Sequence, residues 1–226
     1  STQALSKGGN RPQGFEKTEF KKVAVIGAGL MGAGIAYVQA KAGIPTVLVD
    51  ISKENAEKGK DYSRRLVEKD ISRGRSTEEK GQKLLDLITT TDDYSEIKGA
   101  DLVVEAVFEN PELKAKITKM AEEQLDDTAV FGSNTSTLPI TGLAEASDRP
   151  ENFIGIHFFS PVERMGLVEI ITGEKTSEET LAKSIDYVLA IRKTPIVVND
   201  SRGFYTSRCF GTYTQEGMAM LAEGIK

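Results

Sequence analysis

The sequence from Lys22 reads Val-Ala-Val-Ile-Gly27-Ala-Gly29-Leu-Met-Gly32-Ala-Gly-Ile-Ala36, and the segment Pro45-Thr-Val-Leu-Val-Asp50 follows it. The apolar, β-branched run at 23–26 predicts a buried parallel strand, and a stretch with helical periodicity follows it. A second apolar run, 46–49, ends on Asp50. Glycines spaced G-x-G-x-x-G between a strand and a helix, with an acid closing the next strand, predict a dinucleotide-binding βαβ unit.

The signature glycines each have a physical role in this prediction. Gly27 allows a tight turn, Gly29 leaves room for a pyrophosphate to approach the backbone, and Gly32 lets the helix pack closely on the strand. Free N–H groups at the helix start then face the phosphates. Asp50 is expected to accept hydrogen bonds from the adenosine ribose and to repel a 2′-phosphate, which favours NAD over NADP. The alternative is an ordinary glycine-rich turn, with Asp50 as the N-cap of a helix over 51–58.

The composition excludes several classes of protein. The chain has 226 residues, of which 39% are hydrophobic and 28% charged, as in ordinary globular domains. Its net charge of −5 makes nucleic acid an unexpected partner. The single cysteine, Cys209, excludes an internal disulfide framework and a cysteine-rich metal site, so no metal is expected. No apolar stretch approaches the roughly 20 residues that a membrane span needs.

Strand and helix signals alternate along the chain, which predicts an α/β doubly wound fold. The polar segment 1–20, with Gly, Asn and Pro, is interpreted as a linker or tail. A helical pattern begins again at Gly203 and is still running at the last residue. The further strands are expected near residues 88–91, 101–107, 129–133, 152–159, 167–172 and 195–198, and the further helices over 53–88 with a break near 72–76, 111–124 and 177–191.

His157 and Glu169 are the candidates for proton transfer. Each is an ionisable residue in an otherwise apolar predicted strand, and the two strands follow one another in the sequence. An imidazole placed against a carboxylate is what alcohol oxidation needs, because the imidazole takes the hydroxyl proton as hydride leaves. The alternative is a core histidine with satisfied hydrogen bonds and a glutamate at a strand end, and the spacing alone does not decide between the two.

Polar residues that follow two other strands are further candidates. Ser133–Ser136 places hydroxyls and an amide at a strand end, where they suit a substrate oxygen or a ribose, or else form a polar turn with a helix cap. Glu109 and Lys114 lie one strand earlier, within reach of a cofactor or as a helix-start charge pair with a surface lysine. The basic stretch 53–75 suits either a phosphorylated substrate tail or a solvated helix face.

Six motifs, in this order, resemble the L-3-hydroxyacyl-CoA dehydrogenase family. They are GAGLMGAGIA, VLVD, EAVFENPELK, SNTSTLPI, GIHFFSPVERMGLVEII and VVNDSRGFYTSR. They are most similar to the dehydrogenase part of multifunctional fatty-acid oxidation enzymes, which also carry an enoyl-CoA hydratase domain. The resemblance covers about residues 20–226.

The resemblance implies roles for individual residues. His157 matches the catalytic histidine, Glu169 its carboxylate partner, and Ser136 the serine that contacts the substrate oxygen and the cofactor. Ser160 and Ser207 stand where many members have asparagines near the nicotinamide and the substrate, and a serine reaches less far. The implied cofactor contacts are Gly27, Gly29, Leu30, Met31, Gly32, Asp50, Val107, Phe108, Glu109, Lys114, Ser136 and Ser160.

The resemblance also implies an architecture. Residues 21–200 would form the NAD-binding domain, residues 201–226 the first helix of a truncated helical domain, and residues 1–20 the link from a hydratase portion. The implied partners are an acyl-CoA substrate, a second copy in a homodimer and, in the full-length protein, a thiolase subunit. The expected location is the cytoplasm for a bacterial source and the mitochondrial matrix or peroxisome for a eukaryotic one.

The expected activity is the NAD-dependent oxidation of L-3-hydroxyacyl-CoA in β-oxidation. The alternatives are a short-chain 3-hydroxybutyryl-CoA dehydrogenase and a non-catalytic NAD(H)-binding module. The chain is interpreted as a fragment of a longer polypeptide, which is expected to bind NADH but to turn over substrate poorly or not at all. Its last helix is then expected to expose Phe204, Phe210, Met218 and Leu221 and to favour self-association.

Overall fold

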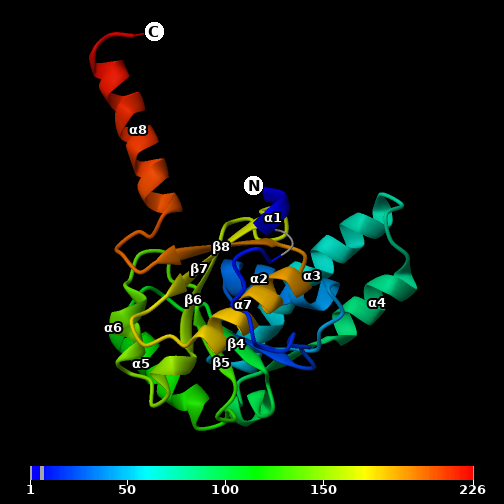
Figure 1. The fold of residues 1–226 in the computed structure, drawn as a ribbon. Coiled ribbons are helices and arrows are strands. Elements are labelled where there is room, and N and C mark those ends of the chain that lie inside the picture. The colour runs from blue at the N-terminus through cyan, green and yellow to red at the C-terminus, as the bar shows by residue number, and fades with distance from the viewer. Residues whose placement is uncertain (1, 6–7, 226) are drawn as a thin grey trace.

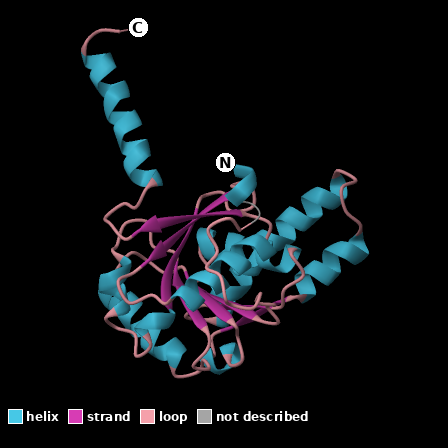
Figure 2. Ribbon diagram, in the orientation of Figure 1, coloured by secondary structure: helices cyan, strands magenta, loops and turns pink. Residues whose placement is uncertain are grey.

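The computed structural model describes residues 2–5 and 8–225, and its centre is an eight-stranded sheet with the order β3-β2-β1-β4-β5-β6-β7-β8 (Figures 1 and 2). Strands β1 to β6 run parallel, β7 is antiparallel to β6, and β8 is parallel to β7. The strands are β1 (Val23–Ile26), β2 (Thr46–Val49), β3 (Ile88–Thr91), β4 (Leu102–Glu105), β5 (Val130–Ser133), β6 (Phe153–Phe158), β7 (Leu167–Thr172) and β8 (Thr194–Asn199).

Helices cover both faces of this sheet, as the doubly wound prediction requires. None of the described helices is long and apolar enough to cross a bilayer. The α-helices are α1 (Thr2–Leu5), α2 (Leu30–Lys41), α3 (Lys53–Ser72), α4 (Glu78–Asp86), α5 (Pro111–Glu122), α6 (Ile140–Ala144), α7 (Glu178–Ala190) and α8 (Thr206–Ala222), with short 3₁₀ turns at Tyr94–Ile97 and Pro150–Asn152.

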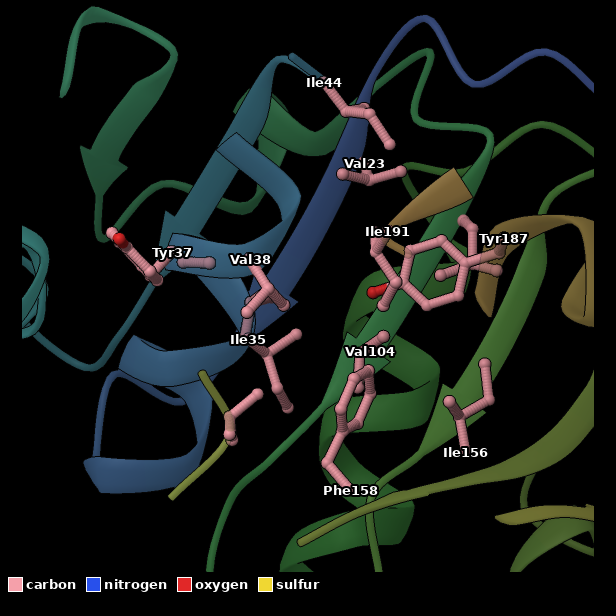
Figure 3. Close-up of a cluster of buried hydrophobic side chains, with 14 of the residues drawn as sticks. Val23, Ile35, Tyr37, Val38, Ile44, Val104, Ile156, Phe158, Tyr187 and Ile191 are labelled. Carbon is pink, nitrogen blue, oxygen red and sulfur yellow. The ribbon is translucent and has the colours of Figure 1, made fainter. Parts of the chain in front are cut away.

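Alternation along the central strands divides the core into two layers. Val23 and Val25 face one layer and Ala24 and Ile26 the other, because successive side chains of a strand point to opposite faces. The first layer joins the sheet to α2 and α7, where Ile35, Val38 and Tyr187 meet Val104, Ile156 and Phe158 (Figure 3). The second layer joins the sheet to α5 and α6. Both layers are needed because a parallel sheet buries both of its faces.

The turn from β6 to β7 breaks the parallel pattern. Only residues 159–166 join the two strands, and a parallel return would need a crossover of a dozen or more residues. The chain therefore folds back, and β7 pairs antiparallel with β6. This reversal places His157 directly opposite Glu169.

The segment that was predicted to be a linker makes specific contacts with the sheet domain. Arg11 forms an ion pair with the buried carboxylate of Asp186 on α7, with 2.7 Å between Nε and Oδ1. The backbone N–H of Thr18 also donates to Asp186, over 2.9 Å. The ring of Phe20 meets the ring of Tyr187 edge-on, with 5.7 Å between the centroids. Residues 11–20 are thus held against α7.

The last helix, α8, projects away from the rest of the molecule (Figure 1). None of its residues, all of which are described, is buried. Phe210, Met218 and Leu221 are 67%, 73% and 76% exposed, as predicted. The expectation for Phe204 is wrong, because this residue precedes the helix and is 2% exposed. A turn with φ of +48° directs its ring into the second core layer instead.

Candidate active site

The turn between β1 and α2 has the tight geometry of a phosphate-binding loop. Gly27 has φ of +99°, and a Cβ on it would lie 2.7 Å from the carbonyl oxygen of Ala106. A Cβ on Gly32 would lie 1.7 Å from the carbonyl oxygen of Gly27, so only glycine allows α2 to begin this close to β1. The first N–H groups of α2 have no partner within the helix and point out of its N-terminus.

The surroundings of this turn fit a dinucleotide. No atom beyond its chain neighbours lies within 4 Å of the point where a Cβ on Gly29 would sit, so this side of the loop is open. The apolar side chains of Leu30, Ile51 and Phe108 are 62%, 90% and 86% exposed. Open space beside backbone N–H donors suits a pyrophosphate, and exposed apolar side chains suit flat rings.

Asp50 lies at the end of β2 and holds the loop by its carboxylate. Its Oδ2 accepts the N–H of Ala28 over 2.7 Å, and its Oδ1 accepts the N–H of Ile51 over 2.7 Å. The N-cap of α3 is Ser52, whose hydroxyl accepts the N–H of Asn55 over 3.2 Å. The alternative in which Asp50 serves as this cap is therefore wrong.

A buried charge cluster lies at the end of β4. Lys114 is 2% exposed, and its Nζ lies 2.7 Å from Oε1 of Glu105 and 3.4 Å from Oε2 of Glu109. The second oxygen of Glu105 accepts the hydroxyl of Ser133 over 2.7 Å. The alternative that made Lys114 a surface residue is therefore wrong. The cluster shapes the turn that carries Val107, whose N–H also donates to Glu105.

Glu105 is a site residue that sequence reasoning missed. The signal was an acidic side chain inside the apolar run 102–107, where an ion needs a buried partner. Without knowledge of the distance between β4 and α5, nothing showed that Lys114 is this partner.

Glu109 joins the end of β4 to the loop after β5. Its Oε1 accepts the N–H of Ser136 over 2.6 Å, the hydroxyl of Ser136 over 3.1 Å and the hydroxyl of Thr135 over 2.9 Å. Burial alone would raise the pKa of Glu109, but these hydrogen bonds and the charge of Lys114 bring the pKa below its ordinary value. Glu109 is therefore an ionised acceptor that orients Ser136. Asn134 fixes the same loop to β6 by accepting the N–H of Phe158 over 2.8 Å.

The His157–Glu169 pair is buried at the carboxyl end of β6. Nδ1 of His157 lies 2.7 Å from Oε2 of Glu169, and the two residues are 6% and 0% exposed. Burial alone would raise the pKa of Glu169, but the hydrogen bonds from His157 and Thr206 bring the pKa below its ordinary value. An ionised carboxylate only accepts hydrogen bonds, so Nδ1 of His157 carries a proton, and in a neutral imidazole the lone pair is then on Nε2.

Glu169 also contacts the start of α8, which the sequence did not reveal. Its Oε1 accepts the N–H of Thr206 over 2.8 Å and the N–H of Tyr205 over 3.2 Å. The ring of Phe204 lies 5.9 Å from the ring of His157, between the centroids. One carboxylate therefore connects the imidazole to the N-terminus of α8.

The two serines at expected asparagine positions lie on different elements. Ser160 is exposed, two residues after β6, and Ser207 is exposed in the first turn of α8. A cavity of about 540 Å³ lies between β8 and this first turn, and Phe204, Tyr205 and Arg208 contribute to its wall.

Part of the basic stretch on α3 pairs with acids of its own helix, as Lys58 does with Glu54 and Arg64 with Asp61.

Comparison with known proteins identifies the family. Residues 22–201 match the sequence profile described as 3-hydroxyacyl-CoA dehydrogenase, NAD binding domain. The chain belongs to this family. The family's domain binds NAD, so the prediction of NAD as the cofactor is confirmed.

Individual relatives agree with this assignment. The fatty acid oxidation complex subunit alpha of Shewanella halifaxensis is 46% identical over 210 residues, which are 92% of this chain and 30% of that protein. The crystal structure of (S)-3-hydroxybutyryl-CoA dehydrogenase from Ralstonia eutropha is 36% identical, with a TM-score of 0.88 over 92% of this chain and 74% of that one. The 3-hydroxybutyryl-CoA dehydrogenase of Escherichia coli is 32% identical, with a TM-score of 0.89 over 92% and 44%. The chain thus spans under a third of the length of the Shewanella protein.

Proposed function

We propose that this chain is the cofactor-binding part of an enzyme that oxidises L-3-hydroxyacyl-CoA to 3-oxoacyl-CoA with NAD in fatty-acid β-oxidation. The observation that carries this proposal is the buried His157–Glu169 pair, at the same edge of the sheet as the glycine turn. A domain that only binds NAD has no need of an oriented imidazole with a free lone pair. The likeness to a fatty acid oxidation complex subunit alpha supports the pathway.

The residues divide the reaction between binding and proton transfer. When bound, NAD⁺ supplies the acceptor for the hydride that leaves C3 of the substrate. Nε2 of His157 takes the proton of the 3-hydroxyl, so that the C3–O bond becomes a carbonyl. Glu169 keeps the imidazole in the required tautomer and stabilises its positive charge as the proton arrives. The hydroxyl of Ser136, oriented by Glu109, donates a hydrogen bond to the substrate oxygen.

The activity is tested with the full-length protein, NAD and L-3-hydroxybutyryl-CoA, by following the formation of NADH. We expect NAD to be reduced with the L substrate and not with the D enantiomer. A protein that binds NADH but does not reduce NAD with any hydroxyacyl-CoA substrate would favour the non-catalytic alternative.

A second candidate is a dehydrogenase specialised for 3-hydroxybutyryl-CoA. The names of the Ralstonia and Escherichia structures favour it, since both are 3-hydroxybutyryl-CoA dehydrogenases. Comparing kcat/KM for acyl chains of four and of sixteen carbons separates the candidates. A preference for the short chain of about 100-fold or more would favour the specialised enzyme, because each buried methylene is worth about 0.8 kcal/mol to an enzyme that accepts long chains.

Asp50 is proposed to bind the adenosine ribose, and Asp50→Ala tests this role. The variant is expected to bind NADH about 10- to 100-fold more weakly, because hydrogen bonds to a charged group contribute about 1.5–3 kcal/mol. Discrimination against NADPH should fall in parallel, since the repelling charge is lost. Titration of both nucleotides, followed by cofactor fluorescence, measures the two effects. Asp92→Ala, at an exposed acid just beyond β3, is the control. An Asp50→Ala variant that binds NADH as tightly as the parent would leave Asp50 with the loop as its only role.

The exposed apolar side chains of α8 are proposed to pair with further protein. One proposed partner is a second copy of the chain, in a homodimer. For the full-length protein, a thiolase subunit is proposed as a further partner. We expect the 226-residue chain to sediment as a concentration-dependent oligomer, because exposed apolar side chains on one helix favour association. Phe210→Ser combined with Leu221→Ser should return it to a monomer. A parent chain that stays monomeric over the whole concentration series would contradict this expectation.

The cytoplasm is the location that we propose, by likeness to the Shewanella relative.

A further inference from the structure

We propose that Lys193 and Tyr62 are positioning residues that hold the 159–166 loop, and with it Ser160, against the helix that begins at the NAD-binding turn. This inference rests on the proposed function, because it assigns the loop the task of setting the nicotinamide end of the cofactor relative to His157. The observation behind it is a buried lysine whose two hydrogen bonds both go to backbone carbonyls of this one loop.

Lys193 lies between α7 and β8 and is 8% exposed. Its Nζ donates to the carbonyl oxygen of Val162 over 2.6 Å and to that of Met165 over 2.5 Å. Among the described residues, no carboxylate lies within ion-pair distance of this ammonium group. Burial lowers the pKa of Lys193, although the charge of Glu163 acts in the opposite direction. Burying an ammonium group is costly unless its donors find acceptors. Here the acceptors are two carbonyl groups of the loop, and the charge-assisted hydrogen bonds hold those groups in place.

Tyr62 holds the same loop from the side of α3. Its hydroxyl donates to Oε2 of Glu163 over 2.7 Å. Burial, and then the hydrogen bond and charge of Glu163, raise the pKa of Tyr62 to about 12, so the hydroxyl remains a donor across the physiological range. The loop is therefore connected to the element that follows β2, far from β6 in the sequence.

The loop also packs directly on α2. Val162 is 2% exposed, and a Cβ on Gly34 would lie 2.9 Å from the Cβ of Val162. Gly34 is in the second turn of α2, whose first turn contains Gly32 of the NAD-binding signature. At the far end of the loop, the N–H of Thr194 donates to the carbonyl oxygen of Gly166 over 2.7 Å.

These contacts connect the base to the cofactor helix through one short segment. The ring of Phe159, the first residue of the loop, lies 4.5 Å from the ring of His157, between the centroids. Ser160 follows, and Val162 already packs on α2. A shift of the loop therefore moves Phe159 and Ser160 relative to His157 and to the N-terminus of α2. Displacements of about 1 Å are enough to lower the rate of a positioned reaction about 100-fold.

The test is Lys193→Met, which keeps the length of the side chain and removes its donors. We expect hydrogen exchange of the 159–166 amides to become about 10-fold faster, because the carbonyl groups of Val162 and Met165 lose their partner. The NADH dissociation constant should rise about threefold, because only one end of the cofactor loses support. In the full-length protein, kcat should fall more than KM rises. Lys193→Arg keeps the charge and the donors, so its loop exchange, NADH affinity and kcat should stay close to those of the parent.

Lys183→Met is the matched control. Lys183 also donates to a backbone carbonyl, that of Thr128 over 3.2 Å, but this hydrogen bond is exposed, and Lys183 lies on α7 outside the loop contacts. Its loss should leave exchange of the 159–166 amides and NADH binding unchanged. Tyr62→Phe removes a single hydroxyl and serves if Lys193→Met does not fold. It should speed exchange around Glu163 about threefold, as expected for one lost hydrogen bond.

The outcomes distinguish this inference from the proposed function. Unchanged loop exchange in both Lys193→Met and Tyr62→Phe would overturn the inference, whatever the activity of the parent. Faster exchange spread evenly over the whole sheet, with unchanged NADH binding, would also overturn it, since Lys193 would then contribute only to stability. A parent that oxidises no hydroxyacyl-CoA would instead contradict the proposed function. Faster loop exchange with weaker NADH binding in the variants would still support the positioning role of Lys193 and Tyr62.

Discussion

Replacing His157 by glutamine is expected to lower kcat about 100- to 10,000-fold, the usual contribution of a positioned general base. Glutamine has a similar reach and can still donate to Glu169, but it cannot take the hydroxyl proton. NADH binding should survive, because the glycine turn and Asp50 are untouched. Steady-state oxidation of L-3-hydroxybutyryl-CoA by the full-length protein measures the first effect, and a fluorescence titration with NADH measures the second.

Glu169→Gln is the informative companion of this variant. It should lower kcat by a smaller factor, because the imidazole remains but its tautomer is no longer selected. It should also lower stability, because glutamine has a single acceptor oxygen, which cannot accept both from His157 and from the N–H groups of Tyr205 and Thr206 at the start of α8. Full turnover by His157→Gln would refute the proposed role of the imidazole, whatever Glu169→Gln does.

Gly32→Ala is expected to abolish measurable NADH binding and to destabilise the chain. The added Cβ would lie 1.7 Å from the backbone oxygen of Gly27, so α2 has to move away from β1. Overpacking of this kind costs about 1–3 kcal/mol or more of the free energy of unfolding. Moving the helix also withdraws its N-terminal N–H groups from the phosphates, and we expect the NADH dissociation constant to rise by about 100-fold or more, as when two charge-assisted hydrogen bonds are lost.

Two other glycines are matched controls for Gly32→Ala. Gly29→Ala meets no protein atom within 4 Å, so it should fold normally and lose affinity for NADH alone. Gly142→Ala, on α6, also meets nothing within 4 Å and should change neither property. Equal NADH affinity in Gly32→Ala and the parent would contradict the assignment of this turn to the pyrophosphate.

Local sequence determined most of the sheet in advance. The β-branched runs at Val23–Ile26 and Thr46–Val49 became β1 and β2 with the predicted bounds, because such runs are buried on both faces of a parallel sheet. The strand predicted over 101–107 ends at Glu105 instead. There the carboxylate turns back onto the N–H of Val107, which ends the extended backbone. The buried carboxylate of Glu105 needs a cationic partner, and that partner is Lys114 on the next helix, α5.

The candidate site was predictable where one strand carries one ionisable residue. His157 and Glu169 were singled out for this reason, and their contact agrees with the expectation that the two strands bring them together. The antiparallel register that pairs them follows from the short loop 159–166, which the sequence alone did not mark as a reversal. The role of each residue in catalysis stays a prediction.

Residues that act across long sequence distances were not predictable. Lys193, between α7 and β8, and Tyr62, on α3, contact the 159–166 loop, and no local pattern shows such contacts. Phe204 was expected on the exposed face of a helix, but it belongs to the turn before α8 and fills the core. Helical periodicity was the wrong guide there, because the turn adopts a left-handed conformation at Gly203 and Phe204 before the helix begins.

A crystal structure of the chain with NADH bound tests the central claim most directly. We expect the pyrophosphate to lie over the N-terminus of α2, the ribose hydroxyls to reach Asp50, and the nicotinamide to lie between Ser136 and Ser160 with its ring facing Nε2 of His157. A nicotinamide bound away from His157, with the imidazole still paired to Glu169 and covered by protein, would contradict it.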